Sequence, residues 1–376
     1  MKIAHLSVFY PFRGGISQFN GHVFRQLSKN HAIKAFNFSL QYPNFLFPGK
    51  SQFVTKDDTK VDQIPTIRTL NSVNPLSYLS TAKQINRFNP DLLITRFWMP
   101  FLGPSLGTVG KLVRSKETKV ICVVDNLIPH EQRFFDRPFT KYFLQSVDAC
   151  LSMSHSVTND ILSLAPNMKI VGHPHPVYDH FGELQSKEAA QAKLNIPKGK
   201  KVLLFFGLIR AYKGLDLLIN AMKELSEEYY LVIAGEPYED FSNYQTLIEN
   251  SGAKDRIQAH TRYIATEEVS LLFSAADAGV LPYKSATQSG VAAMAFHFNL
   301  PVVVTNTGGL KEMIEPHQIG IIAKEPNVSE VVRSIEQLFE SNTEISKISE
   351  NIKNFKANNN WETFSNLIVE TYNSLK

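Results

Sequence analysis

The residues best suited to chemistry lie in polar loops that each follow a short apolar run. One such loop, Ser285-Ala286-Thr287-Gln288-Ser289-Gly290, comes soon after the apolar residues 278–281 and precedes an apolar helix. Hydroxyls, an amide and free backbone N–H groups at the start of a helix can bind an anion. Helix capping by a serine or a threonine is the alternative and would explain one hydroxyl. The loop has four polar residues with Gln288 among them, which favours contact with a phosphate or a sugar.

A second loop, from Phe206 to Gly214, carries two cations, Arg210 and Lys213, between glycines. An arginine can bind a diphosphate as a fork and a lysine can bind it as a point charge. This loop therefore predicts a diphosphate site, and solvated cations without a ligand are the alternative.

Two loops in the first half of the chain add candidates. Gly14 and Gly15 follow the first apolar run, and paired glycines let a backbone approach a ligand closely, although they also make plain turns. Asp125 and His130 follow the apolar run 119–124, where a carboxylate or an imidazole could orient a sugar or accept a proton. A structural hydrogen-bonding loop is the alternative. No spacing of His, Cys, Asp and Glu is typical of a metal site, so we predict no metal.

These loops must be positioned by strands and helices that alternate along the chain. Apolar runs predict strands at 2–8, 32–38, 92–96, 119–124, 150–153 and 168–171, and again at 201–206, 229–234, 257–260, 278–281, 301–305 and 319–323. Amphipathic stretches lie between them, which predicts an α/β fold of doubly wound parallel sheets with helices on both faces.

A proline-containing connector, residues 173–176, and a polar stretch at 183–200 separate the two halves. We therefore predict an N-terminal Rossmann-like domain at 1–182, a C-terminal Rossmann-like domain at 183–358 and a final helical segment at 359–376. Two such domains imply a cleft between them, with ligands at the carboxyl ends of the strands.

Composition places the chain among globular proteins of two domains, since it has 376 residues with 43% hydrophobic and 20% charged. It has neither an apolar run long enough to span a membrane nor the pattern of a signal peptide, so we expect a cytoplasmic location. Cys122 and Cys150 both lie in apolar stretches. We expect them to be buried free thiols in a reducing compartment.

Charge is distributed unevenly between the halves. Residues 1–180 carry 20 Lys and Arg against 11 Asp and Glu, whereas residues 181–376 carry 19 against 24. A basic first half suggests an anionic partner such as an acidic membrane surface, and a solvated surface without a partner is the alternative. No basic helix with interleaved aromatic residues indicates nucleic acid, so we predict none.

Taken together, the loops resemble those of the retaining glycosyltransferase family 4, whose architecture is called GT-B. The resemblance runs over almost the whole chain and is carried by residues 14–15, 126–131, 207–214, 234–236, 262–264, 277–283, 287–290, 301–303 and 307–312. Many members have two glutamates eight positions apart around the helix after residue 289. This chain has the loop Ala286-Thr287-Gln288-Ser289-Gly290 and then Met294 or Ala295 there, which indicates a variant subgroup.

The resemblance implies transfer of a sugar, with retention, from a UDP- or GDP-linked donor to a hydroxyl of a glycan or lipid-linked acceptor. No metal would be required, because cations and helix ends would stabilise the leaving nucleoside diphosphate. The final helix would cross back onto the N-terminal domain. Family members suggest cell-surface polysaccharide or glycolipid biosynthesis, with the protein peripheral on the inner face of the membrane. The apolar loops 42–50 and 97–102 would contact a lipid-linked acceptor.

The resemblance also implies roles for the donor-binding residues. The diphosphate would be bound by Arg210 and Lys213, and the nucleoside by Gly235, Glu236, Tyr263 and Ile264. Phosphate and sugar would be bound by Ser285, Thr287, Gln288, Ser289 and Gly290, with Gly14 and Gly15 approaching from the other domain. Two other functions stay open: a sugar-nucleotide epimerase of the same architecture, and a sugar-nucleotide-binding scaffold without catalytic activity.

Overall fold

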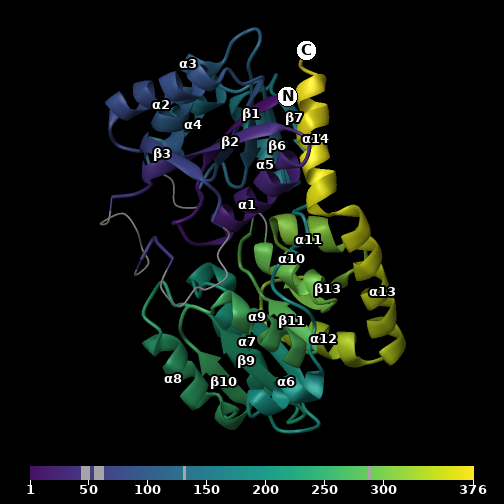
Figure 1. The fold of residues 1–376 in the computed structure, drawn as a ribbon. Coiled ribbons are helices and arrows are strands. Elements are labelled where there is room, and N and C mark those ends of the chain that lie inside the picture. Colours follow the sequence, from purple (N-terminus) through teal and green to yellow (C-terminus); the bar gives the residue numbers. More distant parts are fainter. Residues whose placement is uncertain (44–50, 55–62, 130–132, 287–288) are drawn as a thin grey trace. The chain divides into compact units, whose positions relative to one another are not determined.

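The computed structural model describes residues 1–43, 51–54, 63–129, 133–286 and 289–376. They form two compact units, each built round a parallel sheet (Figure 1). Unit 1 comprises Met1–Pro174 together with Trp361–Lys376, and unit 2 comprises His175–Asn360.

The described residues of unit 1 form a parallel sheet of seven strands in the order β3-β2-β1-β4-β5-β6-β7. The strands are β1 (Lys2–Ser7), β2 (Ala32–Leu40), β3 (Thr66–Asn71), β4 (Leu92–Phe97), β5 (Lys119–Val124), β6 (Ala149–Ser152) and β7 (Lys169–Gly172). Because β1 pairs with β2 on one side and with β4 on the other, the strand order reverses between β1 and β4. Every residue of β4 is buried, including the polar Thr95 and Arg96, so this strand is covered on both faces of the sheet.

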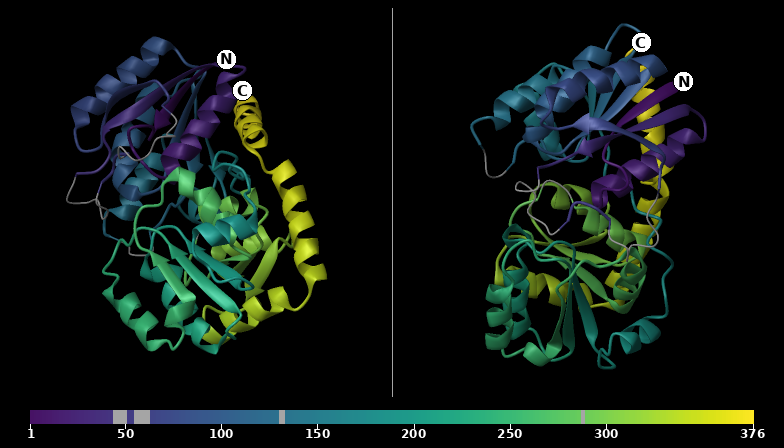
Figure 2. Two further views of the ribbon diagram at one scale, coloured as in Figure 1. Left: turned by 60° about the horizontal axis from the view of Figure 1, so that its bottom comes forward. Right: turned by 60° about the vertical axis from the view of Figure 1, so that its left-hand side comes forward.

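Helices cover both faces of this sheet (Figure 2). They are α1 (Gly15–Ser28), α2 (Pro75–Phe88), α3 (Gly103–Val113), α4 (Asp136–Leu144), α5 (His155–Leu164) and the C-terminal α14 (Trp361–Asn373). Helix α14 packs on α1 through aromatic rings. The ring centroid of Trp361 lies 4.8 Å from that of Phe19 and 4.5 Å from that of His22, and Phe364 lies 5.3 Å from Phe19. This packing makes the C-terminal helix part of unit 1.

The described residues of unit 2 form a parallel sheet of six strands in the order β10-β9-β8-β11-β12-β13. The strands are β8 (Lys201–Phe206), β9 (Tyr229–Ala234), β10 (Ile257–His260), β11 (Ala278–Leu281), β12 (Val302–Thr305) and β13 (Gly320–Ala323). The helices are α6 (Lys187–Lys193), α7 (Leu215–Glu224), α8 (Ser242–Asn250), α9 (Thr266–Ala275), α10 (Gly290–His297), α11 (Gly308–Ile314), α12 (Val328–Phe339) and α13 (Asn342–Asn358). Here the strand order reverses between β8 and β11.

The units divide after Pro174, whereas the sequence placed the boundary after residue 182. The reason is that residues 175–182 hydrogen-bond within unit 2. The backbone N–H of Val177 donates to the carbonyl of Asn359 at 2.8 Å, and the ring Nε2 of His297 lies 2.8 Å from the carbonyl oxygen of Gly182.

The polar stretch expected to be a connector also contains α6. This helix is anchored by the Gln191 side chain, which donates to the carbonyl of Ala275 at 3.1 Å, and by an ion pair between Lys187 and Asp277. The polar composition of residues 183–200 therefore reflects a short surface helix with a buried side rather than an extended linker.

Cys122 and Cys150 occupy paired positions on β5 and β6, and both thiols are free and fully buried. Burial raises the pKa of Cys150 to about 12 and raises the pKa of Cys122 well above its usual value. The expectation of buried free thiols is confirmed. Among the described residues, no helix combines the length and the apolar character needed to cross a membrane.

Candidate functional site

The carboxyl ends of β8, β9, β10 and β11 lie at one edge of the sheet in unit 2. Since these strands are parallel neighbours, the loops that follow them lie side by side, next to the point where the strand order reverses. The loops hold every described donor-site residue that the sequence predicted in this half: Arg210, Lys213, Gly235, Glu236, Tyr263, Ile264, Ser285, Ser289 and Gly290. Thr287 and Gln288 lie outside the described residues.

The loops after β8 and β9 pack backbone against backbone. A Cβ atom added to Gly235 would lie 1.8 Å from the carbonyl oxygen of Gly207, so only glycine allows this approach. Two hydrogen bonds fix the contact: the N–H of Gly207 donates to Ala234 at 2.9 Å, and the N–H of Ile209 donates to the carbonyl of Glu236 at 3.0 Å. Gly235 thus holds the cation-bearing loop against the loop of the buried Glu236.

The two cations of the loop after β8 lie close enough to repel each other. Lys213 is only 8% exposed, and burial together with the charge of Arg210 lowers the pKa of Lys213 to about 8. Its Nζ lies 5.4 Å from the ring centroid of Tyr283, and the guanidinium of Arg210 lies 5.2 Å from that of Tyr238. Within the described parts of the chain, neither cation forms an ion pair with a carboxylate. Such a pair of cations can bind an anion with two negative charges.

Helix α10 begins beside this loop. Its residue Val291 has a methyl carbon 3.1 Å from where a Cβ on Gly207 would lie. The hydroxyl of Ser289, which is 4% exposed, accepts from the N–H of Ala292 at 3.4 Å, so it caps the helix. Capping, the alternative weighed for this loop, therefore accounts for the buried Ser289.

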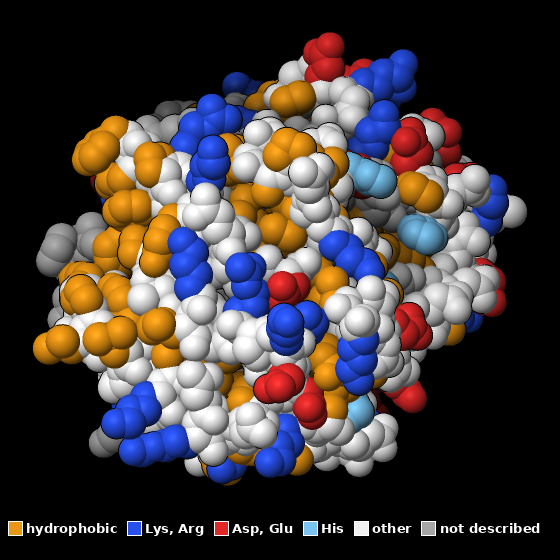
Figure 3. Space-filling model, turned by 90° about the horizontal axis from the view of Figure 1, so that it is seen from above, with side chains coloured by type: hydrophobic (Ala, Val, Ile, Leu, Met, Phe, Trp, Pro, Cys, Tyr) orange, Lys and Arg blue, Asp and Glu red, His pale blue; other side chains and the backbone are white. Residues whose placement is uncertain are grey.

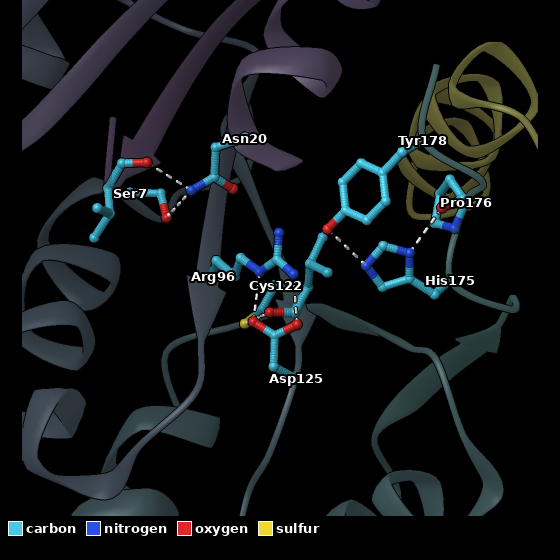
Figure 4. Close-up of polar contacts among 10 residues, drawn as sticks. Ser7, Asn20, Arg96, Cys122, Asp125, His175, Pro176 and Tyr178 are labelled. Carbon is cyan, nitrogen blue, oxygen red and sulfur yellow. Dashed lines mark hydrogen bonds and ion pairs between the residues drawn. The ribbon is translucent and has the colours of Figure 1, made fainter. Parts of the chain in front are cut away.

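The start of α10 is also covered by the segment after Pro174. A Cβ on Gly290 would lie 3.4 Å from the Tyr178 hydroxyl and 4.0 Å from Nε2 of His175. The His175 Nδ1 lies 2.7 Å from the carbonyl oxygen of Pro176, and its Nε2 lies 3.5 Å from the Tyr178 hydroxyl (Figure 4). The sequence predicts only a connector for residues 173–176, because no local pattern shows that this segment packs on a helix far along the chain.

Ion pairs brace the loops on either side. The side chain of Lys284 pairs with Asp216 of α7 at 2.7 Å. The backbone N–H of Lys284 donates to the carbonyl of Tyr212 at 2.7 Å, which joins the loops after β8 and β11. After β10, Arg262 pairs with Glu268 at 2.5 Å and flanks the half-buried Tyr263 and the buried Ile264. These ion pairs could not be predicted from the sequence, since each pair joins residues of separate elements.

In unit 1, Gly14 and Gly15 lie where the strand order reverses, between β1 and α1. Gly14 has φ +106° and precedes α1, while a Cβ there would meet nothing within 4 Å. The backbone conformation, rather than lack of space, therefore selects glycine. The side chain of Asn20 donates to the Ser7 hydroxyl and to the Val8 carbonyl, both at 2.8 Å, and so ties α1 to the end of β1 (Figure 4).

Asp125 follows β5 and is paired with Arg96 of the neighbouring β4 (Figure 4). Nε and Nη2 of Arg96 each donate to a different carboxylate oxygen of Asp125 at 2.5 Å. The two side chains are 4% and 9% exposed, and the guanidinium lies 3.7 Å from the ring centroid of Phe19. Burial, assisted by the charge of Arg96, lowers the pKa of His5 to about 3. His130, the other candidate, lies outside the described residues.

Arg96 was missed as a site residue, although one signal was present. It is the charged residue in the otherwise apolar or neutral strand Leu92–Phe97, and a charge in a buried strand requires a buried partner. Its partner Asp125 follows the next strand of the sheet, which the sequence order alone does not show.

Residues 186–355 match the sequence model of the family described as glycosyl transferases group 1. An uncharacterized glycosyltransferase, MJ1178 of Methanocaldococcus jannaschii, is 24% identical over 381 residues, which cover 96% of this chain and 95% of that protein. The GDP-mannose:glycolipid 4-beta-D-mannosyltransferase of Xanthomonas campestris is 28% identical over 188 residues, which cover 50% of this chain and 50% of that protein.

Solved structures resemble the whole chain. Sucrose-phosphate synthase from Thermosynechococcus elongatus has a TM-score of 0.75 at 17% identity, covering 100% of this chain and 99% of that one. HepE of Anabaena, solved in complex with UDP-glucose, has a TM-score of 0.77 at 14% identity, covering 100% of both chains. The fold is therefore GT-B, as the sequence predicted. Together with the sequence matches, this fold supports a glycosyltransferase.

Proposed function

We propose that the protein transfers a sugar, with retention and without a metal, from a UDP- or GDP-linked donor to a hydroxyl of a glycan or a lipid-linked acceptor. The proposal includes family 4 and a role in cell-surface polysaccharide or glycolipid biosynthesis. It is supported by the family match of residues 186–355 and by relatives whose names specify glycosyl transfer.

The observation that carries the proposal is the pair of cations Arg210 and Lys213. Burying a charge without a counter-charge is costly, and placing a second cation beside it adds to that cost. A donor diphosphate would relieve both costs and would lie close to the N-terminal end of α10, where the helix dipole also favours negative charge. The solved HepE complexes contain UDP or UDP-glucose, which fits a donor of this class.

The chemistry follows from these charges. The bond between the anomeric carbon of the sugar and the diphosphate oxygen breaks, and the diphosphate leaves with the bonding electrons. Arg210, Lys213 and the start of α10 stabilise the negative charge that develops on it. The acceptor hydroxyl forms the new bond to the anomeric carbon, and its proton passes to the leaving diphosphate or to a base of the protein.

The other predicted donor-site residues are assigned by the strand that each of them follows. Gly235 and Glu236 follow β9, the neighbour of β8, and Tyr263 and Ile264 follow β10, the strand beyond it, so we assign these four residues to the nucleoside side of the donor site. We assign Ser285, Ser289 and Gly290 to the phosphate and sugar side. The roles of Thr287 and Gln288, which lie outside the described residues, and the approach of Gly14 and Gly15 to the donor stay predictions from the sequence.

Two catalytic candidates are retained. Asp125 is proposed to orient the sugar rather than to take a proton, because both of its oxygens already accept hydrogen bonds from Arg96. His130 remains the predicted proton acceptor.

The acceptor is proposed to be membrane-linked, with the protein cytoplasmic and peripheral on the membrane surface. This is supported by the basic charge of residues 1–180 and by the word glycolipid in the name of the Xanthomonas relative. The Met99–Phe101 segment is half-buried or buried. Residues 44–50 of the other predicted acceptor loop lie outside the described residues.

Titration calorimetry with UDP-, GDP- and ADP-sugars, without added metal, tests the donor site. One nucleotide class should bind, and Lys213→Met, which keeps the buried aliphatic stem, should weaken it by about 10- to 150-fold through loss of a charge-assisted hydrogen bond. Lys223→Met is the matched control, because Lys223 is an exposed lysine of the neighbouring α7. No heat with any nucleotide, or equal loss in the control, would overturn the proposal.

Product analysis separates the three functions considered. Release of nucleoside diphosphate only when an acceptor is added identifies a transferase, and NMR of the new glycosidic linkage decides between retention and inversion. An altered sugar nucleotide formed without acceptor identifies an epimerase. Tight binding with no product of either kind identifies a scaffold.

A further inference from the structure

Unit 1 carries an apolar face on the outer side of α2. Leu76 and Leu79 of this helix are 74% and 54% exposed, and Leu112 at the end of α3 is 45% exposed. A shallow groove of about 490 Å³ runs between the two helices, lined by Leu79, Ala82, Lys83, Asn86, Arg87 and Leu112. We call these lining residues together with Leu76 the α2–α3 face. Neighbouring exposed leucines are typical of an interaction surface, whereas single scattered ones are not.

Leu76 and Leu79 do not belong to the side of α2 that packs on the core. Helix α2 already buries another side, formed by Tyr78, Thr81, Ala82 and Ile85. Leu76, Leu79, Lys83 and Arg87 lie three or four positions apart, so they form a separate stripe on the helix surface. One side of α2 therefore packs on the core. The side toward solvent is apolar at its start, with Leu76 and Leu79, and basic at its end, with Lys83 and Arg87.

The charge of this face has one sign. Neither α2 nor α3 contains an Asp or Glu. Lys83 and Arg87 are exposed and, among the described residues, make no ion pair. Lys111 at the end of α3 contacts the Tyr142 ring and the Gln145 side-chain oxygen rather than a carboxylate.

Figure 3 looks down on the end of unit 1. Hydrophobic side chains gather on one side of this view, with Lys and Arg side chains next to them. A surface of leucines bordered by cations matches a bilayer with acidic headgroups, because leucines enter the headgroup–acyl boundary while lysines and arginines remain at the phosphates.

We infer that the α2–α3 face docks unit 1 on an anionic phospholipid bilayer. A second copy of this chain would fit less well, because a two-fold contact through this face would bring Lys83 and Arg87 of both copies together. The inference deepens the proposed membrane location by naming the surface, and it places that surface on α2 and α3 rather than on the loops 42–50 and 97–102.

Flotation of the full chain with vesicles tests the inference without measuring sugar transfer, so failure of this inference and failure of the proposed function are distinguishable. The wild-type protein should float with vesicles of phosphatidylglycerol and phosphatidylcholine and should stay at the bottom with phosphatidylcholine alone. Lys83→Gln and Arg87→Gln should each weaken partitioning by about fivefold. Leu76→Ser with Leu79→Ser should weaken it by about tenfold or more.

The matched control carries Leu184→Ser and Lys198→Gln, which change an exposed leucine and an exposed lysine of unit 2. This variant should float as the wild type does. Each variant is first shown by circular dichroism to unfold at the wild-type temperature, which the exposure of the changed residues predicts. Three results would overturn the inference: no flotation of the wild type, equal loss in the control, or leucine-dependent dimerisation in sedimentation without lipid binding.

Discussion

Raising the pH should weaken donor binding, because the proposed diphosphate site depends on a lysine that loses its proton near neutrality. Burial and the neighbouring Arg210 lower the pKa of Lys213 from 10.5 to about 8. The donor binds the form with a protonated Lys213 more tightly, so the affinity is almost fully present at pH 7 and is lost as the pH rises through the pKa of about 8. For a pKa of about 8, the protonated fraction falls from about 90% at pH 7 to about 10% at pH 9.

The apparent dissociation constant of the donor should therefore rise by about tenfold between pH 7 and pH 9. The two tyrosines nearby do not titrate in this range, because burial raises the pKa of both Tyr212 and Tyr283. Calorimetry at constant ionic strength, repeated in buffers of different ionisation enthalpy, measures both the affinity and the proton taken up on binding.

The variant Lys213→Met provides the internal check. Its donor affinity should be low and independent of pH over the same range, because the titrating group is gone. A wild-type affinity that is flat from pH 7 to pH 9, or a variant that keeps the same pH dependence, would refute the assignment of Lys213 to the diphosphate.

Three predictions concern stability, each measured as the free energy of unfolding in urea. Gly235→Ala should cost at least about 3 kcal/mol, since the added carbon would lie 1.8 Å from the Gly207 carbonyl; a wild-type value would mean that the two loops separate freely. Asp125→Asn should cost about 3–5 kcal/mol by leaving Arg96 buried without its counter-charge, and a loss below about 1 kcal/mol would contradict a buried pair. Trp361→Ala should cost about 3–5 kcal/mol and release α14 to proteolysis, whereas an intact, protected helix would show that its ring packing is dispensable.

Much of the fold could be predicted because buried parallel strands have a strong sequence pattern. The strands β5, β8, β9 and β11 have the predicted bounds, since their buried apolar runs end at polar loops. The edge strand β10 also has the predicted bounds, although none of its residues is fully buried. β3 was missed because it is an edge strand in which only Leu70 is buried. α13 was missed because only Ile348, Ile352 and Phe355 are buried along its 17 residues, which leaves a mostly polar sequence.

The candidate site, too, could be predicted only in part from the sequence. The sequence by itself determined which residues follow the strands of unit 2, and parallel pairing then requires those loops to share one edge. Only the tertiary structure decided which distant groups meet there. It pairs Asp125 with Arg96, sets Gly235 against the Gly207 carbonyl and leaves Lys213 buried without a carboxylate partner among the described residues. Such contacts depend on strand order and on the distance between neighbouring strands, which a linear pattern of residue types does not contain.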